Sequence, residues 1–336
     1  MRIKLILALV LLTLLPMFAT AAGPLEKEWG ISLNRGMNLG NMLDAPKGVS
    51  WGVQLEANFF DLIKSAGFDH VRIPIRWSDY TAKEAPYLIE SAFAKKVDWA
   101  IKCALDRRLF VIINVHHFDA LMKDPNGQRA RFIAIWKQLA ERYKSYPNAV
   151  FFELLNEPCE QMTAVRWNGL FAETLAVVRK TNPTRLVVVG PVQYNNISQL
   201  PSLQLPANDQ HLLVTVHYYN PFDFTHQGAE WVGKKNKIGV TWQATPEQLA
   251  ALRKDLDTAA AWAKQNKRPL FIGEYGTFDR AGMNSRAKWT YAVTKEALAR
   301  KMPVTYWEFC STFGMYNPEE KCWRPELLNA VLAAEK

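Results

Sequence analysis

The sequence is poor in cysteine and histidine, the residues that build metal centres and disulfide frameworks. Its 336 residues include four cysteines and six histidines, and the cysteines show no spacing typical of a zinc site. Four thiols do not make a disulfide framework for a chain of this length. Cys310 and Cys322 lie within one late loop and could pair, whereas Cys103 and Cys159 are expected to be buried thiols.

Long apolar runs are lacking beyond residue 22, so no later segment is apolar enough to cross a bilayer. Residues 1–22 combine Arg2 and Lys4 with an apolar run and small residues, which is typical of a secretory signal peptide. We expect this segment to be removed. The mature protein is then secreted, to the extracellular space or a periplasm, and makes no contact with the membrane.

A concentrated patch of one charge sign is also lacking. Removing Arg2 and Lys4 from the 41 basic residues leaves 39 against 32 acidic residues, a net charge of +7 that is scattered along the chain. Scattered charge argues against a nucleic-acid partner and favours an uncharged or extracellular substrate. No repeat or Pro/Gly-rich linker divides residues 25–336, so we expect one domain over residues 23–336, present as a monomer.

The chain does contain eight short apolar runs, rich in β-branched residues and mostly separated by helical patterns. Continuous apolar runs are typical of parallel strands buried on both faces. Strands that alternate with helices eight times predict the α/β class and a single (β/α)8 TIM barrel. The predicted strands lie near residues 35–38 and begin near residues 70, 110, 150, 185, 212, 269 and 303. The predicted helices lie near residues 54–66, 91–107, 131–143, 162–181, 245–266 and 284–300, and the segment after the fifth strand is mostly loop.

Polar side chains stand where five of these strands end. The carboxyl ends of the strands of such a barrel meet at one rim, and the loops there carry the chemistry. Three of the six histidines fall at these ends, which chance placement would not produce. The polar ends are His116 and His117 on the third strand, Asn156 and Glu157 on the fourth, His217 and Tyr219 on the sixth, Glu274 on the seventh, and Trp307 and Glu308 on the eighth.

Two glutamates at one rim, Glu157 and Glu274, suit the cleavage of a glycosidic bond. The departing oxygen of an acetal needs a proton and the anomeric carbon needs a carboxylate, so one carboxyl must be protonated and the other ionised. Arg72, at the end of the second strand, could hold one of them as a carboxylate. Taken singly, each residue has an ordinary structural explanation, because a glutamate at a strand end is usually solvated. Their joint occurrence favours a reaction centre.

Glu153 lies deeper in the same strand as Glu157 and shares its face, because the two residues are four apart. A buried carboxylate needs a partner, and we expect Arg35 to supply it. The role of Glu153 is therefore expected to be structural.

Aromatic residues make up 12% of the chain, and twelve of them are tryptophans. Sugar rings have apolar C–H faces that stack on aromatic planes, so tryptophans in loops at the rim are candidates for a cleft wall. Trp136 lies in a helical pattern and is expected in the core. The loop candidates are Trp51, Trp231, Trp242 and Trp323.

An ordered set of motifs resembles a known family over about residues 30–315. The segments RGMNLGN, HVRIPIRW, NVHH, ELLNEP, VHYYNP, FTHQGAEW, FIGEYG and YWEF together resemble the secreted endo-β-1,4-glucanases (cellulases) of glycoside hydrolase family 5. The resemblance implies a retaining, endo-acting (β/α)8 glycosidase that cleaves cellulose and related β-glucans by double displacement. It implies neither a metal nor an organic cofactor.

The resemblance also implies the roles of the catalytic residues. Glu157 would be the acid/base and Glu274 the nucleophile, while Asn156 would bind the 2-hydroxyl of the reacting sugar. Arg72 and Tyr219 would position and ionise the nucleophile.

Further roles follow for residues around the two glutamates. His116 and His217 would support the two carboxyls, and Trp307 would stack on the sugar that reacts. The residues that match neighbouring sugar sites are His117, Asn38 and Trp231.

Other functions remain open at this point. Hydrolases of β-mannan, mixed-linkage glucan and xyloglucan share the scaffold, and loop geometry decides between these substrates. A metal-dependent hydrolase with His116, His117 and a glutamate as ligands is disfavoured, because adjacent residues of a strand point to opposite faces. A non-catalytic carbohydrate-binding barrel would have no need of both glutamates.

Overall fold

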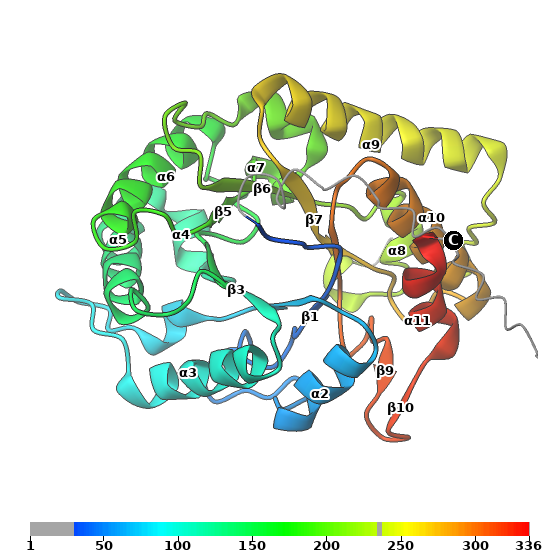
Figure 1. Ribbon diagram of the computed structural model, residues 1–336, viewed down its shortest axis with the longest axis horizontal. Coiled ribbons are helices and arrows are strands. Elements are labelled where there is room, and N and C mark those ends of the chain that lie inside the picture. Colours follow the sequence, from blue (N-terminus) through cyan, green and yellow to red (C-terminus); the bar gives the residue numbers. More distant parts are fainter. Residues whose placement is uncertain (1–29, 234–236, 336) are drawn as a thin grey trace, which may run out of the picture.

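The computed structural model describes residues 30–233 and 237–335, so the predicted signal peptide lies outside it. In the described chain eight parallel strands close into a barrel in sequence order, with the eighth strand next to the first (Figure 1). The predicted (β/α)8 barrel is confirmed. The strands are β1 (Arg35–Asn38), β2 (His70–Ile73), β3 (Phe110–Asn114), β4 (Val150–Glu153), β5 (Val187–Val189), β6 (Leu212–His217), β7 (Leu270–Tyr275) and β8 (Val304–Tyr306).

Helices surround the barrel and bury one face each against it (Figure 1). The start of α9 shows a local reason for its position, because Thr245 and Gln248 form a capping box and Pro246 follows the cap. None of the described helices is long and apolar enough to span a membrane. The longer helices are α2 (Ala57–Ser65), α3 (Ser91–Asp106), α5 (Pro125–Arg142), α6 (Ala164–Arg179), α9 (Pro246–Asn266), α10 (Met283–Ala299) and α11 (Pro325–Leu332).

Shorter elements complete the chain. The short helices are α4 (Asp119–Lys123), α7 (Val192–Asn195) and α8 (Phe222–Thr225). Short 3₁₀ helices span Trp77–Tyr80, Ile197–Ser202, Glu230–Val232 and Ala333–Glu335. A two-stranded ribbon pairs β9 (Tyr316–Asn317) with β10 (Cys322–Trp323).

The inside of the barrel changes from apolar to polar along the strands. Residues two apart on a strand share a face, so β4 carries Phe151 and then Glu153 on its inner face, and β3 carries Ile112 and then Asn114. The apolar members belong to one buried cluster, while the polar members lie nearer the carboxyl ends of the strands. On β3 and β4 the inner face is therefore apolar lower in the barrel and polar beneath its mouth.

The loop between β5 and β6 is irregular, as the sequence predicts. Gln193, Tyr194 and Asn195, within α7, all have positive φ (55°, 62° and 56°), a left-handed conformation that side chains rarely adopt. This turn lies at the mouth of the barrel.

Two expectations about side chains are corrected by the structure. Cys310 is buried and Cys322 is exposed, and both are free thiols, so they do not pair. Trp242 is only 2% exposed, so it does not stand in a cleft wall, whereas Trp323 is half-buried and packs on Phe309. As expected, Trp136 is fully buried and Cys103 is a buried thiol, whereas Cys159 is half-buried.

Candidate active site

The two glutamates reach the mouth of the barrel from facing strands. Glu274 belongs to β7, and Glu157 lies just beyond the end of β4 with a positive φ of 46°. A non-glycine residue in this conformation is uncommon and tends to occur at functional sites. One carboxylate oxygen of Glu157 lies within 4.8 Å of one of Glu274. The predicted convergence of the two carboxyls is thus observed.

Arg72 connects the polar layer of the barrel to the mouth. It is fully buried, and its guanidinium has five N–H donors. Nε and Nη2 donate to the two oxygens of Glu153 at 2.6 and 2.8 Å, and Nη1 donates to Glu274 Oε1 at 2.7 Å. The remaining donors reach Asn38 Oδ1 at 2.8 Å and Asn156 Oδ1 at 2.7 Å. All five donors are used, so the guanidinium is held in one orientation.

This network corrects the predicted partner of Glu153. Both carboxylate oxygens of Glu153 bind Arg72, whereas Arg35 donates from Nε to the carbonyl of Val331. Burial alone would lower the pKa of Arg72, but the charges of Glu153 and Glu274 raise it, so the guanidinium stays positive. Glu153 is a structural strut, as expected, but its partner is Arg72.

Asn38 also differs from its predicted role. Its exposed fraction is 0%, and its Nδ2 donates to the carbonyls of Gly273, Thr305 and Tyr306 while its Oδ1 accepts from Arg72. A side chain that is buried and hydrogen-bonded in this way cannot contact a sugar. Asn38 instead orients Arg72 from below.

Glu274 accepts two strong hydrogen bonds. Besides Arg72, the hydroxyl of Tyr219 donates to Oε2 at 2.9 Å. Burial raises the pKa of Glu274, while His217 and the charge of Arg72 oppose that rise. Two donors directed at one carboxylate favour its ionised form, because each of them stabilises negative charge.

Glu157 lies in a different environment. His217 Nδ1 is 2.7 Å from its Oε1, and the side chain is 27% exposed in the mouth. Burial raises the pKa of Glu157 to about 7, and Arg72 only partly opposes this. Burial thus raises the pKa of both carboxyls, but the donors from Arg72 and Tyr219 oppose this effect more directly at Glu274 than any group does at Glu157.

Asn156 lies between these two groups. It is buried, and its oxygen accepts from Arg72 Nη2, which turns its Nδ2 away from Arg72. An amide fixed in this way presents a donor of defined orientation.

His116 does not support either glutamate. Asn114 Oδ1 accepts from the backbone N–H of Ile75, so Asn114 Nδ2 faces His116 Nδ1 at 3.1 Å. Nδ1 is then an acceptor, and the imidazole hydrogen is on Nε2. The His116 ring stacks on Trp307, with 5.6 Å between the ring centroids and 2° between the planes. The expected contact with a carboxyl is replaced by one that orients the indole.

Trp307 and its neighbours form one half of the mouth. A Cβ on Gly40 would come within 2.7 Å of the indole, so only glycine allows the ring this close to β1. His117 packs edge-on against Trp51. Trp51 is 39% exposed, which is consistent with its predicted place in a cleft wall. Asp44 Oδ2 lies 4.0 Å from His117 Nε2.

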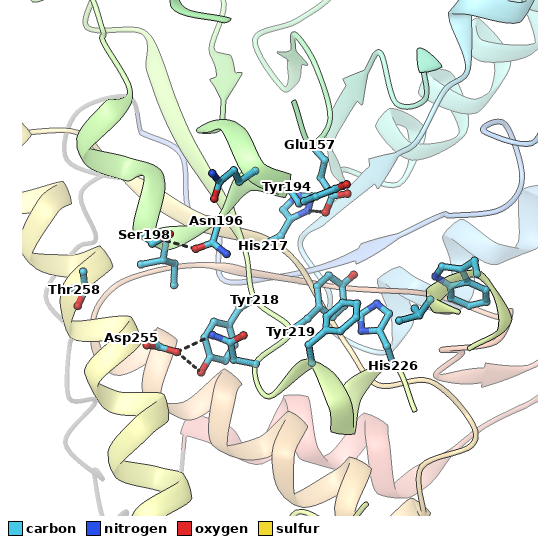
Figure 2. A pocket seen from close by; sticks show the side chains of 16 residues that line it. Glu157, Tyr194, Asn196, Ser198, His217, Tyr218, Tyr219, His226, Asp255 and Thr258 are labelled. Carbon is cyan, nitrogen blue, oxygen red and sulfur yellow. Dashed lines mark hydrogen bonds and ion pairs between the residues drawn. The ribbon is translucent and has the colours of Figure 1, made fainter. Parts of the chain in front are cut away.

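The other half of the mouth is a pocket of about 670 Å³ that begins at Glu157 and His217. Figure 2 shows Glu157 beside His217, with Tyr194 on the same side and Tyr219 and His226 further along. Trp231 lines this pocket, is 64% exposed and packs edge-on against Phe278. Aromatic side chains thus line the mouth both around Trp307 and in the pocket that begins at Glu157.

Two groups of described side chains have the composition of a metal site. Asp44, His116 and His117 form one of them. In that group His116 has no nitrogen lone pair to offer, since Nδ1 accepts from Asn114 and Nε2 carries the hydrogen.

Glu157, His217 and Glu274 form the second group. Here the guanidinium of Arg72 already binds Glu274, and a second cation beside it would be repelled. The residues of neither group fit a bound metal.

Three residues of this site were not predicted: Asp44, Asn114 and Asn195. The NVHH motif contains a signal for Asn114, because residues 114 and 116 share a face of the strand. Asp44 lies in a loop and Asn195 ends the irregular turn α7, and periodicity gives no such signal for either.

The chain is similar to known proteins over most of its length. A family model described as cellulase (glycosyl hydrolase family 5) matches residues 32–312. Endoglucanase H of Acetivibrio thermocellus is 34% identical over 305 residues, which cover 89% of this chain but 33% of that protein. The chain thus spans about a third of that relative's length. Endoglucanase B of Clostridium cellulovorans is 29% identical, with 88% of this chain and 73% of that protein covered.

Solved structures are similar over nearly the whole chain. Cel5A of Thermotoga maritima, in a mutant form with cellobiose, is 44% identical with a TM-score of 0.89, covering 93% of this chain and 100% of that one. The same protein in complex with mannotriose is 46% identical with a TM-score of 0.87, covering 89% of this chain and 97% of that one.

Proposed function

The chain belongs to glycosyl hydrolase family 5, the cellulase family, and on this premise we propose that it is a retaining endo-β-1,4-glucanase. One observation carries the proposal. Two carboxyls with oxygens within 4.8 Å of each other face one mouth, and different neighbours surround them. Retaining glycosidases have carboxyls about 5–5.5 Å apart, whereas inverting ones separate them by roughly 6.5–9.5 Å.

In the first step Glu274 attacks the anomeric carbon and Glu157 gives its proton to the departing oxygen. Arg72 and Tyr219 hold the Glu274 carboxylate in place, and the raised pKa of Glu157 keeps its proton available near neutral pH. The glycosyl–enzyme ester forms as the glycosidic bond breaks.

In the second step the ionised Glu157 takes a proton from water, and the resulting hydroxide equivalent attacks the same carbon. The ester to Glu274 breaks and Glu157 is protonated again. Asn156, fixed by Arg72, presents its amide N–H to the 2-hydroxyl of the sugar in both transition states. Two inversions give net retention.

The aromatic side chains of the mouth support binding of sugars on both sides of the reacting bond. Trp307 would carry the sugar that reacts, with His117 beside the next sugar, while Trp231 would contact sugars on the leaving side. Binding sugars on both sides of the bond favours cleavage within a chain. The names of the two curated relatives favour glucan as the substrate, and Thermotoga maritima Cel5A has been solved with a mannose trimer. Reducing-end assays on carboxymethylcellulose, lichenan and galactomannan would measure the preference.

The roles of the two glutamates can be separated by azide rescue. With 2,4-dinitrophenyl β-cellobioside, Glu274→Gly plus azide should give the α-azide, because azide replaces the nucleophile. Glu157→Ala plus azide should give the β-azide, because azide then attacks the glycosyl–enzyme. NMR of the anomeric proton distinguishes the products. Wild-type activity in Glu274→Gly without azide would contradict the assignment.

Export is a further part of the proposal. We propose that residues 1–22 act as a signal peptide and that the barrel works outside the cytoplasm. N-terminal sequencing of the mature protein from a secreting host would test this, and an intact N-terminus on exported protein would contradict it.

A further inference from the structure

Asn195 is a buried polar residue at the mouth to which neither the sequence motifs nor the proposed mechanism give a role. Its neighbours Tyr194 and Asn196 line the pocket beside Glu157 (Figure 2). Asn195 itself has an exposed fraction of 0% and turns inward, with its Nδ2 3.2 Å from His217 Nε2.

The two ring nitrogens of His217 face different groups, carboxyls at Nδ1 and an amide at Nε2. On one side Nδ1 is 2.7 Å from Glu157 Oε1 and 3.5 Å from Glu274 Oε2. On the other side Nε2 faces the Asn195 amide. A neutral imidazole has one N–H and one lone pair, so the group that donates to one nitrogen places the hydrogen on the other. Donation by Asn195 therefore places the hydrogen of His217 on Nδ1, facing the carboxyls.

The surroundings of Asn195 support this orientation of its amide. Its Oδ1 is buried without a hydrogen-bond partner among the described residues. The reverse orientation would bury the NH2 group there instead, and unpartnered buried N–H groups are rarer than unpartnered carbonyls. It would also turn the lone pair of His217 Nδ1 toward the negatively charged carboxylate of Glu274, which is unfavourable. The neighbours of both His217 nitrogens thus favour the same orientation of the Asn195 amide, with Nδ2 toward His217.

The local backbone is built to bring Asn195 to this place. Three successive residues with positive φ, Gln193 to Asn195, reverse the chain so that the side chain of Asn195 turns under the mouth. A Cβ on Gly190 would come within 2.2 Å of Asn195 Oδ1, so a glycine is required for the amide to fit. Such strained turns are kept where a function needs them.

We propose that Asn195 is a positioning residue for acid catalysis: by donating to His217 Nε2 it keeps the imidazole hydrogen on Nδ1, so that His217 cannot accept the proton of Glu157. The inference rests on the proposed function. With the hydrogen on Nδ1, Glu157 Oε1 is an acceptor and the acidic proton sits on Oε2, free to reach the departing oxygen. With the hydrogen on Nε2, the lone pair of Nδ1 would bind that proton and withhold it from the leaving group. Burial also lowers the pKa of His217 to about 4, which keeps the ring neutral.

The test compares substrates that differ in their need for a proton. Cellotetraose has a poor leaving group, whereas 2,4-dinitrophenolate departs from its β-cellobioside unprotonated. The variants are Asn195→Ala and Asn195→Asp, whose carboxylate would pull the hydrogen to Nε2. We expect kcat/KM for cellotetraose to fall about 10-fold in Asn195→Ala and about 100-fold in Asn195→Asp. Neither loss exceeds the ~10²–10⁴-fold that general acid catalysis supplies. The aryl cellobioside should lose less than about 3-fold. Equal losses on both substrates, or none, would overturn the proposal.

Asn182→Ala is the matched control. Asn182 is also a buried asparagine, 4% exposed, and donates to the carbonyl of Ala140 on the outside of the barrel. Its loss should lower stability without changing the ratio of kcat/KM between the two substrates. If Asn182→Ala changed the ratio of kcat/KM between the two substrates to a similar extent, a general loss of stability would explain the effect of the Asn195 variants.

A second readout does not depend on activity. The ¹⁵N shifts of His217 at pH 7 report which nitrogen carries hydrogen. We expect Nδ1–H in the wild type and hydrogen on Nε2 in Asn195→Asp. Hydrogen on Nε2 in the wild type would overturn the proposal even if the enzyme is active. A wild type that cleaves neither substrate would contradict the proposed function, while the shifts would still decide the state of His217.

Discussion

Glu157 and Glu274 are the same residue type, and only their neighbours make them different. Glu274 receives donors from Arg72 and Tyr219, whereas Glu157 receives one from His217. A carboxyl with fewer charged donors in a buried place keeps its proton to higher pH. This difference gives a direct prediction for pH dependence.

Loss of the Glu157 proton should limit the enzyme on the alkaline side. Its pKa of about 7 predicts that kcat/KM falls above about pH 7, because the acid form of Glu157 disappears. The stability effect has the same origin. In the folded protein the pKa of Glu157 is raised above the usual 4.5. Its ionisation therefore does not change the free energy of unfolding below pH 4.5, and lowers it progressively as the pH rises to about 7. Glu157→Gln should therefore unfold like the wild type at pH 4 and be more stable by up to about 3 kcal/mol at pH 8. Urea unfolding at the two pH values measures this, and a gain at pH 4 equal to that at pH 8 would contradict it.

Glu153 should affect both stability and pH dependence. Glu153→Gln removes the bidentate partner of Arg72 and should lower the free energy of unfolding by about 3 kcal/mol. The charge of Glu153 also raises the pKa of Glu157, so its removal should move the alkaline limit of kcat/KM to lower pH. Glu141→Gln, which breaks an exposed pair with Lys144, is the control and should change stability by less than about 0.5 kcal/mol. An alkaline limit that moves upward would refute this account.

At the residue scale, the sequence motifs located the side chains but not all of their contacts. Residue type and strand position were enough to bring Glu157, Glu274 and Arg72 together. Asn38 has the same polar character and the same kind of position, yet it is buried under Arg72. Whether an amide faces a ligand or a neighbouring guanidinium depends on depth inside the barrel, which periodicity does not encode.

At the scale of elements, the strands were predictable because each is a continuous apolar run that is buried on both faces. The turn at α7 was predictable only as a loop. Its three positive φ values lie at Gln193, Tyr194 and Asn195, none of which is glycine. The side chain of Asn195 contacts His217, which lies 22 positions later in the chain, and no local pattern in the sequence encodes that contact.

The tight fit at this turn gives a third prediction. Gly190→Ala should lower the free energy of unfolding by about 1–3 kcal/mol, because the new methyl group meets the Asn195 amide. It should also lower kcat/KM for cellotetraose more than for the aryl cellobioside, since Asn195 is displaced. Gly169→Ala in α6 is the matched control: nothing lies within 4 Å of its added methyl group, and helix propensity should stabilise it by up to about 1 kcal/mol. Equal stability changes in the two variants, measured by thermal and urea unfolding, would contradict the expected contact.

On the scale of the whole molecule, we propose that a bound glucan extends to both sides of the glutamates. Trp307 and His117 would contact it on one side, and the pocket lined by Trp231 would receive it on the other. A long substrate would touch both halves, whereas an aryl cellobioside would depend mainly on the half at Trp307. The two halves can therefore be tested separately.

Trp231→Ala should weaken turnover of long chains only. Loss of one stacking surface, worth about 1 kcal/mol, should lower kcat/KM for cellohexaose about 5-fold and leave the aryl cellobioside nearly unchanged. Trp99→Ala is the control, because Trp99 is 39% exposed in α3 and lies away from the pocket. Steady-state kinetics on both substrates would show the difference. An equal effect on the two substrates would place Trp231 outside the path of the glucan.

Because all five Arg72 donors are occupied, one side chain links the stability of the barrel to catalysis. The same guanidinium holds a strut of the barrel, Glu153, and the nucleophile, Glu274. A substitution in either partner therefore disturbs both thermal tolerance and turnover, so selection cannot tune one property here independently of the other. Libraries aimed at heat resistance should leave this cluster intact and vary the outer helices, where changes in stability need not reach the nucleophile.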